Sequence, residues 1–226
     1  MTDRLYVAVK APRVGFAKTR LARAIGTDAA IDLYRGFLLD LSARLTKACL
    51  PVGWFITPDD AWPEIAPFVH QRNEPPVILE QGEGDWTQRQ QRLFQGMSAR
   101  QENRVLLMSS DSPHIDAAIL ADAFEKLNHH DVVIGPVTDG GYYMVGMRAS
   151  HDVLAGVRMS TSTVYEQILF NARIQGLRVG ISPETFDIDE GDDLRWLLPL
   201  ADEANDLKAT RAVLDRYGLL SRTEVA

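Results

Sequence analysis

Acidic residues follow apolar segments at three points of the chain. Asp111, Asp139 and the pair Asp187 and Asp189 each come shortly after a short apolar run. In open α/β sheets, ligands bind at the carboxyl ends of the strands, so these carboxylates are expected to meet at one edge. Mg²⁺ or Mn²⁺ needs only one or two carboxylates when water and substrate phosphates complete its shell. The pattern predicts a divalent-cation site formed by Asp111, Asp187 and Asp189, with Asp111 also a catalytic candidate. The alternative for Asp111 is a turn or helix-capping residue.

A cationic loop follows the first apolar segment and could bind phosphate. Residues 4–27 contain basic but no acidic residues, although the protein as a whole has a formal net charge of −7. Gly15 would allow a close approach of the backbone, while Lys18, Thr19 and Arg20 offer donors to phosphate oxygens. A solvated cationic turn is the competing interpretation, and charge and position alone leave the two about equal.

The segment Asp139-Gly140-Gly141-Tyr142 has two compatible interpretations. Asp-Gly is a strong turn signal, so the segment is expected to form a tight turn between two strands. The same residues could form a glycine-lined floor beneath a sugar or nucleotide, with Asp139 bonding to hydroxyl groups. Asp139 is also the first candidate for a general base.

Other reactive residue types give weaker signals. No G-x-S-x-G motif supports a hydrolase triad. His114 is the only histidine near the Asp111 motif and is a candidate for a supporting role. Cys49 is the only cysteine, which excludes a disulfide framework and a multi-cysteine zinc site; its helical context predicts a buried thiol.

Apolar, β-branched segments alternate with helical patterns along the whole chain. This alternation predicts a mainly parallel sheet covered by helices on both faces, in a three-layer α/β/α architecture. The segment after Gly141 is expected to add an antiparallel strand, which would make the sheet mixed. The predicted strands are residues 5–9, 52–57, 77–79, 105–108, 132–136, 142–147 and 177–181.

Composition limits the remaining possibilities. The 226 residues contain no linker or low-complexity tract, so a single domain over residues 1–226 is expected. The acidic net charge argues against non-specific nucleic-acid binding. No apolar run is long enough to span a membrane and no secretory leader is recognisable, which predicts a cytoplasmic protein. The last helical pattern, with Leu207, Leu214 and Tyr217, could pack on the core or form a homodimer contact.

Five segments in this order resemble one family. They are similar to the DUF2064 group of bacterial GT-A-type proteins, commonly classed as glycosyltransferases, and the resemblance extends over about residues 5–198. Molybdenum-cofactor nucleotidyltransferases and phospholactate guanylyltransferases belong to the same broad superfamily. The segments are KAPRVGFAKTRL (10–21), SSDSP (109–113), DVVIGPVTDGGYYMVG (131–146), STST (160–163) and FDIDEGDDL (186–194).

The resemblance implies a nucleotide-diphospho-sugar transferase fold and a role for each segment. Lys18 and Arg20, helped by Lys10 and Arg13, would hold nucleotide phosphates. Asp111 of the strand-end motif would hold the cation, and the late Asp187-x-Asp189 motif would complete the metal side. The Asp-x-Asp signature of such proteins is incomplete here because Ser109 stands in its first position. Relatives often carry a tryptophan where this chain has Met159.

Three functions remain open at this stage. The first is transfer of a sugar from a nucleotide-diphospho-sugar to an unknown small-molecule acceptor. The second is nucleotidyl transfer from a nucleoside triphosphate to a phosphorylated acceptor, with release of pyrophosphate. The third, suggested by Ser109, is a nucleotide-binding module without turnover.

Overall fold

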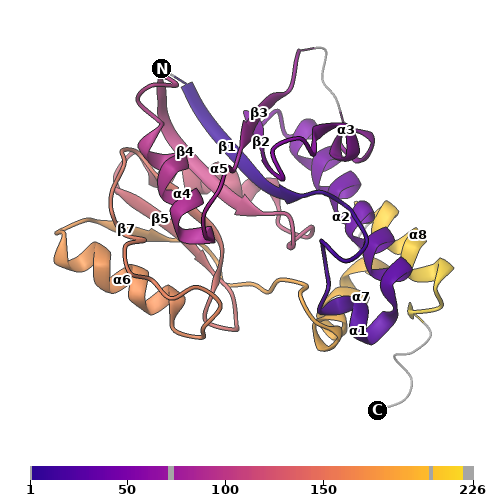
Figure 1. Cartoon of the computed structure of the whole chain (residues 1–226). Coiled ribbons are helices and arrows are strands. Elements are labelled where there is room, and N and C mark those ends of the chain that lie inside the picture. The colour runs from indigo at the N-terminus through magenta and orange to yellow at the C-terminus, as the bar shows by residue number, and fades with distance from the viewer. Residues whose placement is uncertain (1, 71–73, 204–205, 221–226) are drawn as a thin grey trace.

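The computed structural model describes residues 2–70, 74–203 and 206–220, and Figure 1 shows the arrangement of their helices and strands. Every predicted strand is present, with boundaries shifted by a few residues at most. The strands in this part of the chain are β1 (Thr2–Lys10), β2 (Val52–Thr57), β3 (Val77–Glu80), β4 (Glu102–Ser109), β5 (Val132–Pro136), β6 (Tyr142–Met147) and β7 (Val179–Ile181).

Helices connect most of these strands. The longest is α2, whose apolar side chains recur at helical spacing and are buried along one face. The start of α4 is set by a capping box, in which Asp85 and Gln88 each accept a hydrogen bond from the other's backbone N–H. The helices are α1 (Leu21–Ile25), α2 (Thr27–Lys47), α3 (Trp62–Ile65), η1 (Ala66–Phe68), α4 (Trp86–Gln95), α5 (Ala117–Lys126), α6 (Val164–Ile174), η2 (Gly191–Asp193), α7 (Leu194–Glu203) and α8 (Lys208–Arg216).

The strands form one mixed sheet in the order β3-β2-β1-β4-β6-β5-β7. Strand β1 runs parallel to both β2 and β4, β2 runs parallel to β3, and β5 runs parallel to β7. Strand β6 is antiparallel to both of its neighbours, as the Gly-Gly-Tyr-Tyr segment predicted. The expectation of a mixed, mainly parallel sheet is therefore confirmed.

Each face of the sheet carries its own apolar core. Leu5, Val7 and Val9 of β1 face a core shared with α2, α5, α7 and α8, whereas Tyr6 faces a second core shared with α4 and α6. Figure 1 shows α4 and α6 on one side of the sheet and α2, α7 and α8 on the other. Alternate side chains of a strand point to opposite faces, so β1 must be apolar on both sides.

Two uncertain features of the sequence are settled by this packing. Helix α8 lies against α2 with Leu214 fully buried, so the last helical pattern packs on the core of this chain. The prediction of a buried Cys49 thiol is wrong: α2 ends at Lys47, and Cys49 lies beyond it with an exposed side chain. In the described ranges, none of the helices has the length and apolar character needed to cross a membrane.

The strand directions place four chain segments at one edge of the sheet. Strands β1, β4, β5 and β7 all run the same way, so the residues that follow them emerge together. The backbone after β7 then runs beside the loop after β4, because Ile188 N donates to Asp111 O over 3.1 Å. This edge holds the cationic loop and every predicted acidic motif.

Candidate active site

The centre of this edge is an ion-pair network between the first loop and the acidic motifs. Lys18 Nζ lies 2.5 Å from Asp111 Oδ1 and 3.6 Å from Asp189 Oδ1. Arg20 Nη1 lies 3.7 Å from Asp189 Oδ2 and 3.8 Å from Glu190 Oε1. These groups are far apart along the chain and the fold brings them into one cluster, so the predicted proximity of the first loop and the acidic motifs is confirmed.

Lys18 reaches the acidic residues from an unusual backbone conformation. Its φ is 52°, in the left-handed region that non-glycine residues seldom occupy. The side chain is only 3% exposed, and its ammonium donates to Ile188 O over 2.5 Å. The ammonium also lies 5.8 Å from the centre of the Tyr34 ring and 5.6 Å from that of Phe37, in cation–π range. A buried ammonium is stable only with such partners.

Asp111 is held by a turn that the sequence departure at Ser109 helps to form. The backbone N–H of Asp111 donates to Ser109 Oγ over 3.0 Å. Burial by itself would raise the pKa of Asp111, but the ammonium of Lys18 outweighs it and lowers that pKa. Asp111 is therefore an anion at neutral pH, and the hydroxyl of Ser109 supports its turn.

Asp187 and Asp189 project from the same side of an extended segment, as their spacing predicted. Ile188 between them is fully buried in the core against α2 and α7, and Phe186 packs against the same core. Alternation along the extended backbone then turns the two carboxylates away from this core, and that of Asp189 lies within 4 Å of both Lys18 and Arg20.

Negative charge exceeds positive charge around Asp187. Burial, reinforced by the carboxylates of Asp189, Asp139 and Asp111 and opposed by Lys18, raises the pKa of Asp187 to about 7. Burial and Asp111 also raise the pKa of Asp189. Crowded carboxylates of this kind attract a cation, and their oxygens are the ligands that Mg²⁺ and Mn²⁺ prefer.

The predicted metal ligands nevertheless do not form a complete set of protein ligands. Among the described residues, no three His, Cys, Asp or Glu side chains are arranged to hold a metal ion. Lys18 instead contacts Asp111 and also lies close to Asp189. The carboxylates fit a hard cation by their chemistry, but substrate phosphate would have to complete its coordination.

The turn between β5 and β6 brings Asp139 to the same edge. Asp139 Oδ1 accepts the N–H of Gly141 over 2.8 Å, which confirms the turn interpretation, and its charge acts on Asp187. Gly140 has φ 88°, and its carbonyl accepts the N–H of Tyr165 at the start of α6 over 2.9 Å. The turn is thus fixed between the acidic cluster and α6.

Replacing Gly140 with alanine is expected to lower the free energy of unfolding by about 2–4 kcal/mol, from the strained φ together with the steric conflict. An added Cβ would lie 1.9 Å from Ser162 O, so the backbone must move. The matched control is Gly156→Ala, where φ is 67° and no atom lies within 4 Å of the added Cβ. Equal losses in the two variants in urea unfolding would contradict the predicted steric effect at Gly140.

Several predicted phosphate-binding residues take other partners. Arg13 forms a bidentate pair with Glu64 of α3, so its guanidinium is engaged by a carboxylate outside the acidic cluster. Gly15 and Thr19 line a separate hollow of about 250 Å³ between the loop, α1 and α2. Lys10 stays near the cluster, because its charge contributes to the lowered pKa of Asp111. The structure therefore brings Lys10, Lys18 and Arg20 to the acidic residues and leaves the other three on the loop's periphery.

Tyr142 also points elsewhere than the sugar-binding role would require. Its hydroxyl donates to Gln90 Oε1 over 2.7 Å, and its ring packs against the core under α4 and α6. Gly140 and Gly141 remain at the turn, beside Asp139. Met159, where relatives often have tryptophan, contacts the Tyr142 hydroxyl through its sulfur at 3.9 Å.

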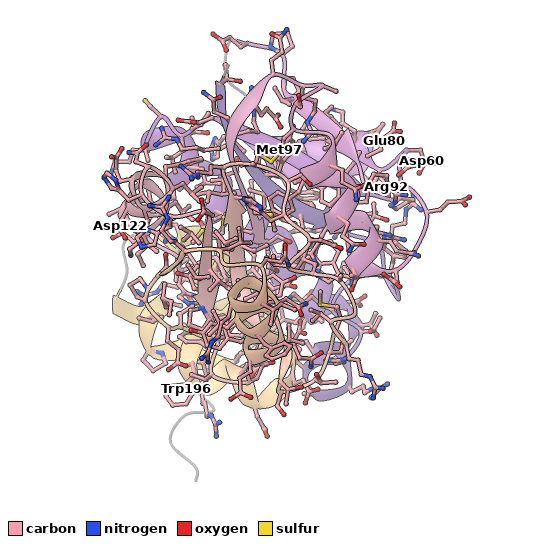
Figure 2. The ribbon with its side chains drawn as sticks, turned by 90° about the vertical axis from the view of Figure 1, so that its left-hand side faces the viewer. Asp60, Glu80, Arg92, Met97, Asp122 and Trp196 are labelled. Atoms are coloured by element: carbon pink, nitrogen blue, oxygen red, sulfur yellow. The ribbon has the colours of Figure 1, made fainter. Side chains whose placement is uncertain are left out.

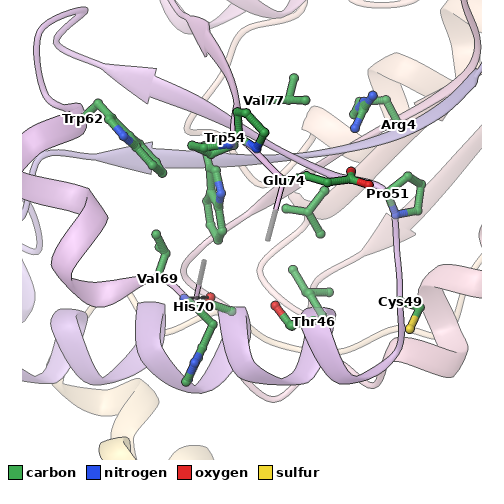
Figure 3. Close-up of a pocket in the computed structure, with 15 residues that line it drawn as sticks. Arg4, Thr46, Cys49, Pro51, Trp54, Trp62, Val69, His70, Glu74 and Val77 are labelled. Carbon is green, nitrogen blue, oxygen red and sulfur yellow. Dashed lines mark hydrogen bonds between the residues drawn. The ribbon is translucent and has the colours of Figure 1, made fainter. Parts of the chain in front are cut away.

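A larger cavity lies away from this edge. It has a volume of about 270 Å³ and lies between the end of α2, β2 and the segments flanking β3. Figure 3 shows Trp54 and Trp62 along one part of its wall and Thr46 and Cys49 along another. None of the predicted site residues lines it, so cavity size alone does not locate the acidic site.

Tyr34 is a site residue that the helical pattern predicted only as an apolar position of a helix. Its hydroxyl accepts the N–H of Lys10 over 3.1 Å and is 3.0 Å from Ser110 Oγ, so it joins the ends of β1 and β4. Burial, reinforced by the charge of Asp111, raises the pKa of Tyr34 and keeps the hydroxyl protonated. The helical pattern of α2 gave no signal for this role, because a buried tyrosine looks like any other core residue.

Comparisons with known proteins agree with this fold. A protein from Desulfovibrio desulfuricans G20, assigned as a nucleotide-diphospho-sugar transferase, is 31% identical, with 98% of each chain covered and a TM-score of 0.87. A 2-phospho-L-lactate guanylyltransferase from Methanothermobacter thermautotrophicus is 27% identical over 187 residues, which cover 80% of this chain and 78% of that protein.

More distant structures share the fold alone. A cytidylyltransferase from Leptospira borgpetersenii is 12% identical, with a TM-score of 0.57 over 100% of this chain and 99% of the other. These relatives carry the names of transferases, in agreement with the class predicted from the sequence. Residues 40–161, more than half of the chain, match the family described as "Uncharacterized protein conserved in bacteria (DUF2064)", and the chain belongs to this family.

Proposed function

We propose that this protein transfers a group from a nucleotide donor, with the donor's diphosphate bound between Lys18, Arg20 and the acidic residues. The observation that supports this most directly is the network in which Lys18 lies within 4 Å of both Asp111 and Asp189. Cationic side chains stabilise the negative charge that develops on a leaving phosphate. Asp111, Asp187 and Asp189 would hold a Mg²⁺ or Mn²⁺ ion, which when bound supplies further charge neutralisation at the diphosphate.

The chain's own residues would then bind and orient the substrate. Phosphate oxygens would draw the Lys18 ammonium away from Asp111, since a diphosphate carries more charge than one carboxylate. Arg20 is more exposed than Lys18 and can contact the donor from the solvent side. Asp139, beside the glycine turn, is the residue best placed to accept a proton from an acceptor hydroxyl.

The first candidate reaction is glycosyl transfer to a small-molecule acceptor. It is supported by the likeness to the Desulfovibrio desulfuricans protein over 98% of both chains. The second candidate is nucleotidyl transfer, favoured by the likeness to the 2-phospho-L-lactate guanylyltransferase over 80% of this chain. The same cationic and acidic groups serve both, because both reactions place negative charge on a leaving phosphate group.

Binding and product analysis together test the proposal. Nucleoside triphosphates and nucleotide-sugars would be screened by calorimetry with and without Mn²⁺, and we expect tighter binding with the metal for at least one of them. Release of a nucleoside diphosphate would identify glycosyl transfer, and release of pyrophosphate would identify nucleotidyl transfer. If no member of either class bound with or without Mn²⁺, the proposed function would be wrong.

A further inference from the structure

The two acidic motifs are joined by a set of contacts outside the ion-pair network. The segment that carries Asp187 and Asp189 is attached to the loop after β4 by one backbone hydrogen bond and by two hydrogen bonds that involve side chains. These contacts are Ile188 N to Asp111 O at 3.1 Å, Ser112 Oγ to Phe186 O at 3.2 Å, and His114 Nε2 to Thr185 Oγ1 at 2.8 Å.

His114 makes a second contact with the same segment. Its ring stacks on Phe186 with the ring centres 4.1 Å apart and the planes inclined by 14°. The Phe186 ring in turn lies 6.2 Å from that of Trp196, which is 49% exposed and lies at the edge of the molecule in Figure 2. Phe186 is thus held between a half-buried histidine and a surface tryptophan.

This stack determines which way the carboxylates point. Phe186 and Ile188 occupy the core side of the extended segment, so Asp187 and Asp189 occupy the other. Rotation of the segment would have to separate the Phe186 ring from His114 and break the bond to Thr185. The two contacts together resist that rotation.

The hydrogen-bonding state of His114 suits this role. Its Nδ1 is buried and has no hydrogen-bond partner among the described residues. A buried N–H without a partner costs more than a buried lone pair without one, which favours the tautomer with the proton on Nε2. Nε2–H then donates to Thr185 Oγ1. Burial also lowers the pKa of His114 to about 4, with the nearby Arg44 adding to the effect, so the ring is neutral.

We propose that His114 is a positioning residue that holds Asp187 and Asp189 beside Asp111, through its hydrogen bond to Thr185 and its stacking on Phe186. Removing a residue that orients the ligands of a metal ion commonly lowers the affinity for that metal 10–100-fold. The inference deepens the proposed function and rests on it wherever ligand affinity is the readout.

The first test needs no ligand. His114→Phe keeps a flat ring against Phe186 but loses the bond, and Thr185→Val loses the same bond from the other side. Hydrogen exchange at the Ile188 amide, which bonds to Asp111 O, should accelerate about tenfold in both variants. Exchange at Ile188 should be no faster in the double variant than in either single variant, because each of these variants lacks the same hydrogen bond between His114 and Thr185. Unchanged exchange at Ile188 in both single variants would overturn the proposal.

The second test measures binding of Mn²⁺ with inorganic pyrophosphate by calorimetry. We expect affinity to fall at least about tenfold in His114→Phe and in Thr185→Val. His151→Phe is the matched control, since His151 is also half-buried and lies outside the acidic cluster. Lower thermal stability with affinity within twofold of the wild type would show a purely structural role and overturn the proposal. Failure of the wild type to bind would instead contradict the proposed function, and the exchange result would still decide the role of His114.

The neutral state of His114 also predicts a pH effect on stability. With a folded-state pKa of about 4 and an unfolded value near 6.5, the unfolded chain binds more protons between these values. The contribution of neutral His114 to the free energy of unfolding is complete above about pH 6.5. It is lost as the pH falls toward 4, and the total loss is up to about 3 kcal/mol. The difference in unfolding free energy between the wild type and His114→Phe should therefore change over this window. A difference that is constant from pH 7 to pH 4 would contradict the prediction.

Discussion

Replacing Asp111 with asparagine is expected to lower turnover at least about 100-fold and to weaken the metal-dependent binding of the nucleotide by a similar factor. The substitution keeps the shape of the side chain and removes its charge. Asp111 is the carboxylate in direct contact with Lys18, and its charge also acts on Asp187 and Asp189. Its loss therefore affects the phosphate side and the metal side of the site together.

The free Asp111→Asn protein is also expected to be less stable, because Lys18 keeps a buried ammonium without its nearest carboxylate. Affinity measured by calorimetry therefore separates the loss of the site better than melting temperature alone. Asp192→Asn is the matched control, since Asp192 is an exposed carboxylate close in sequence to Asp189. Nucleotide affinity that is equally metal-dependent in Asp111→Asn and in the wild type would rule out Asp111 as a ligand of the cation.

Replacing Lys18 with methionine is expected to have opposite effects on two ligands. Nucleotide binding should weaken by about 10–100-fold, since charge-assisted hydrogen bonds to phosphate are worth a few kcal/mol. Binding of Mn²⁺ alone should become tighter, because the ammonium that now lies 2.5 Å from Asp111 and 3.6 Å from Asp189 is gone. In the wild type the cation has to compete with this ammonium for the same oxygens.

This competition implies that nucleotide and metal bind cooperatively. Phosphate that draws Lys18 away frees Asp111 for the metal, and by linkage the metal must favour the nucleotide by the same factor. Calorimetric titrations of each ligand, alone and with the other present, measure this coupling. Each ligand should strengthen binding of the other in the wild type, and this cooperativity should be absent in Lys18→Met. Lys47 is exposed, and Lys47→Met is the control. Weaker Mn²⁺ binding in Lys18→Met would contradict the idea that the ammonium occupies the cation's place.

Part of the site follows from the order of segments along the chain and from alternation within them. Alternation of side chains along an extended segment fixed that Asp187 and Asp189 share a side while Ile188 is buried. The direction of the strands fixed that Asp111 and Asp139 lie at one edge of the sheet. Order and spacing of five motifs were enough to indicate the family to which the chain belongs.

Contacts between distant segments could be known only from the tertiary structure. Lys18 and Arg13 are both basic residues of the first loop, yet Lys18 bonds to a carbonyl 170 residues away while Arg13 pairs with Glu64, 51 residues away. His114 meets Thr185 across 71 residues. A charged side chain takes whichever partner the packing of its helix and loop brings near, and no local pattern records that choice. The sequence by itself determined that the first loop and the acidic motifs meet at one edge of the sheet; only the packing of helices and loops decided which of their side chains join the cluster and which touch.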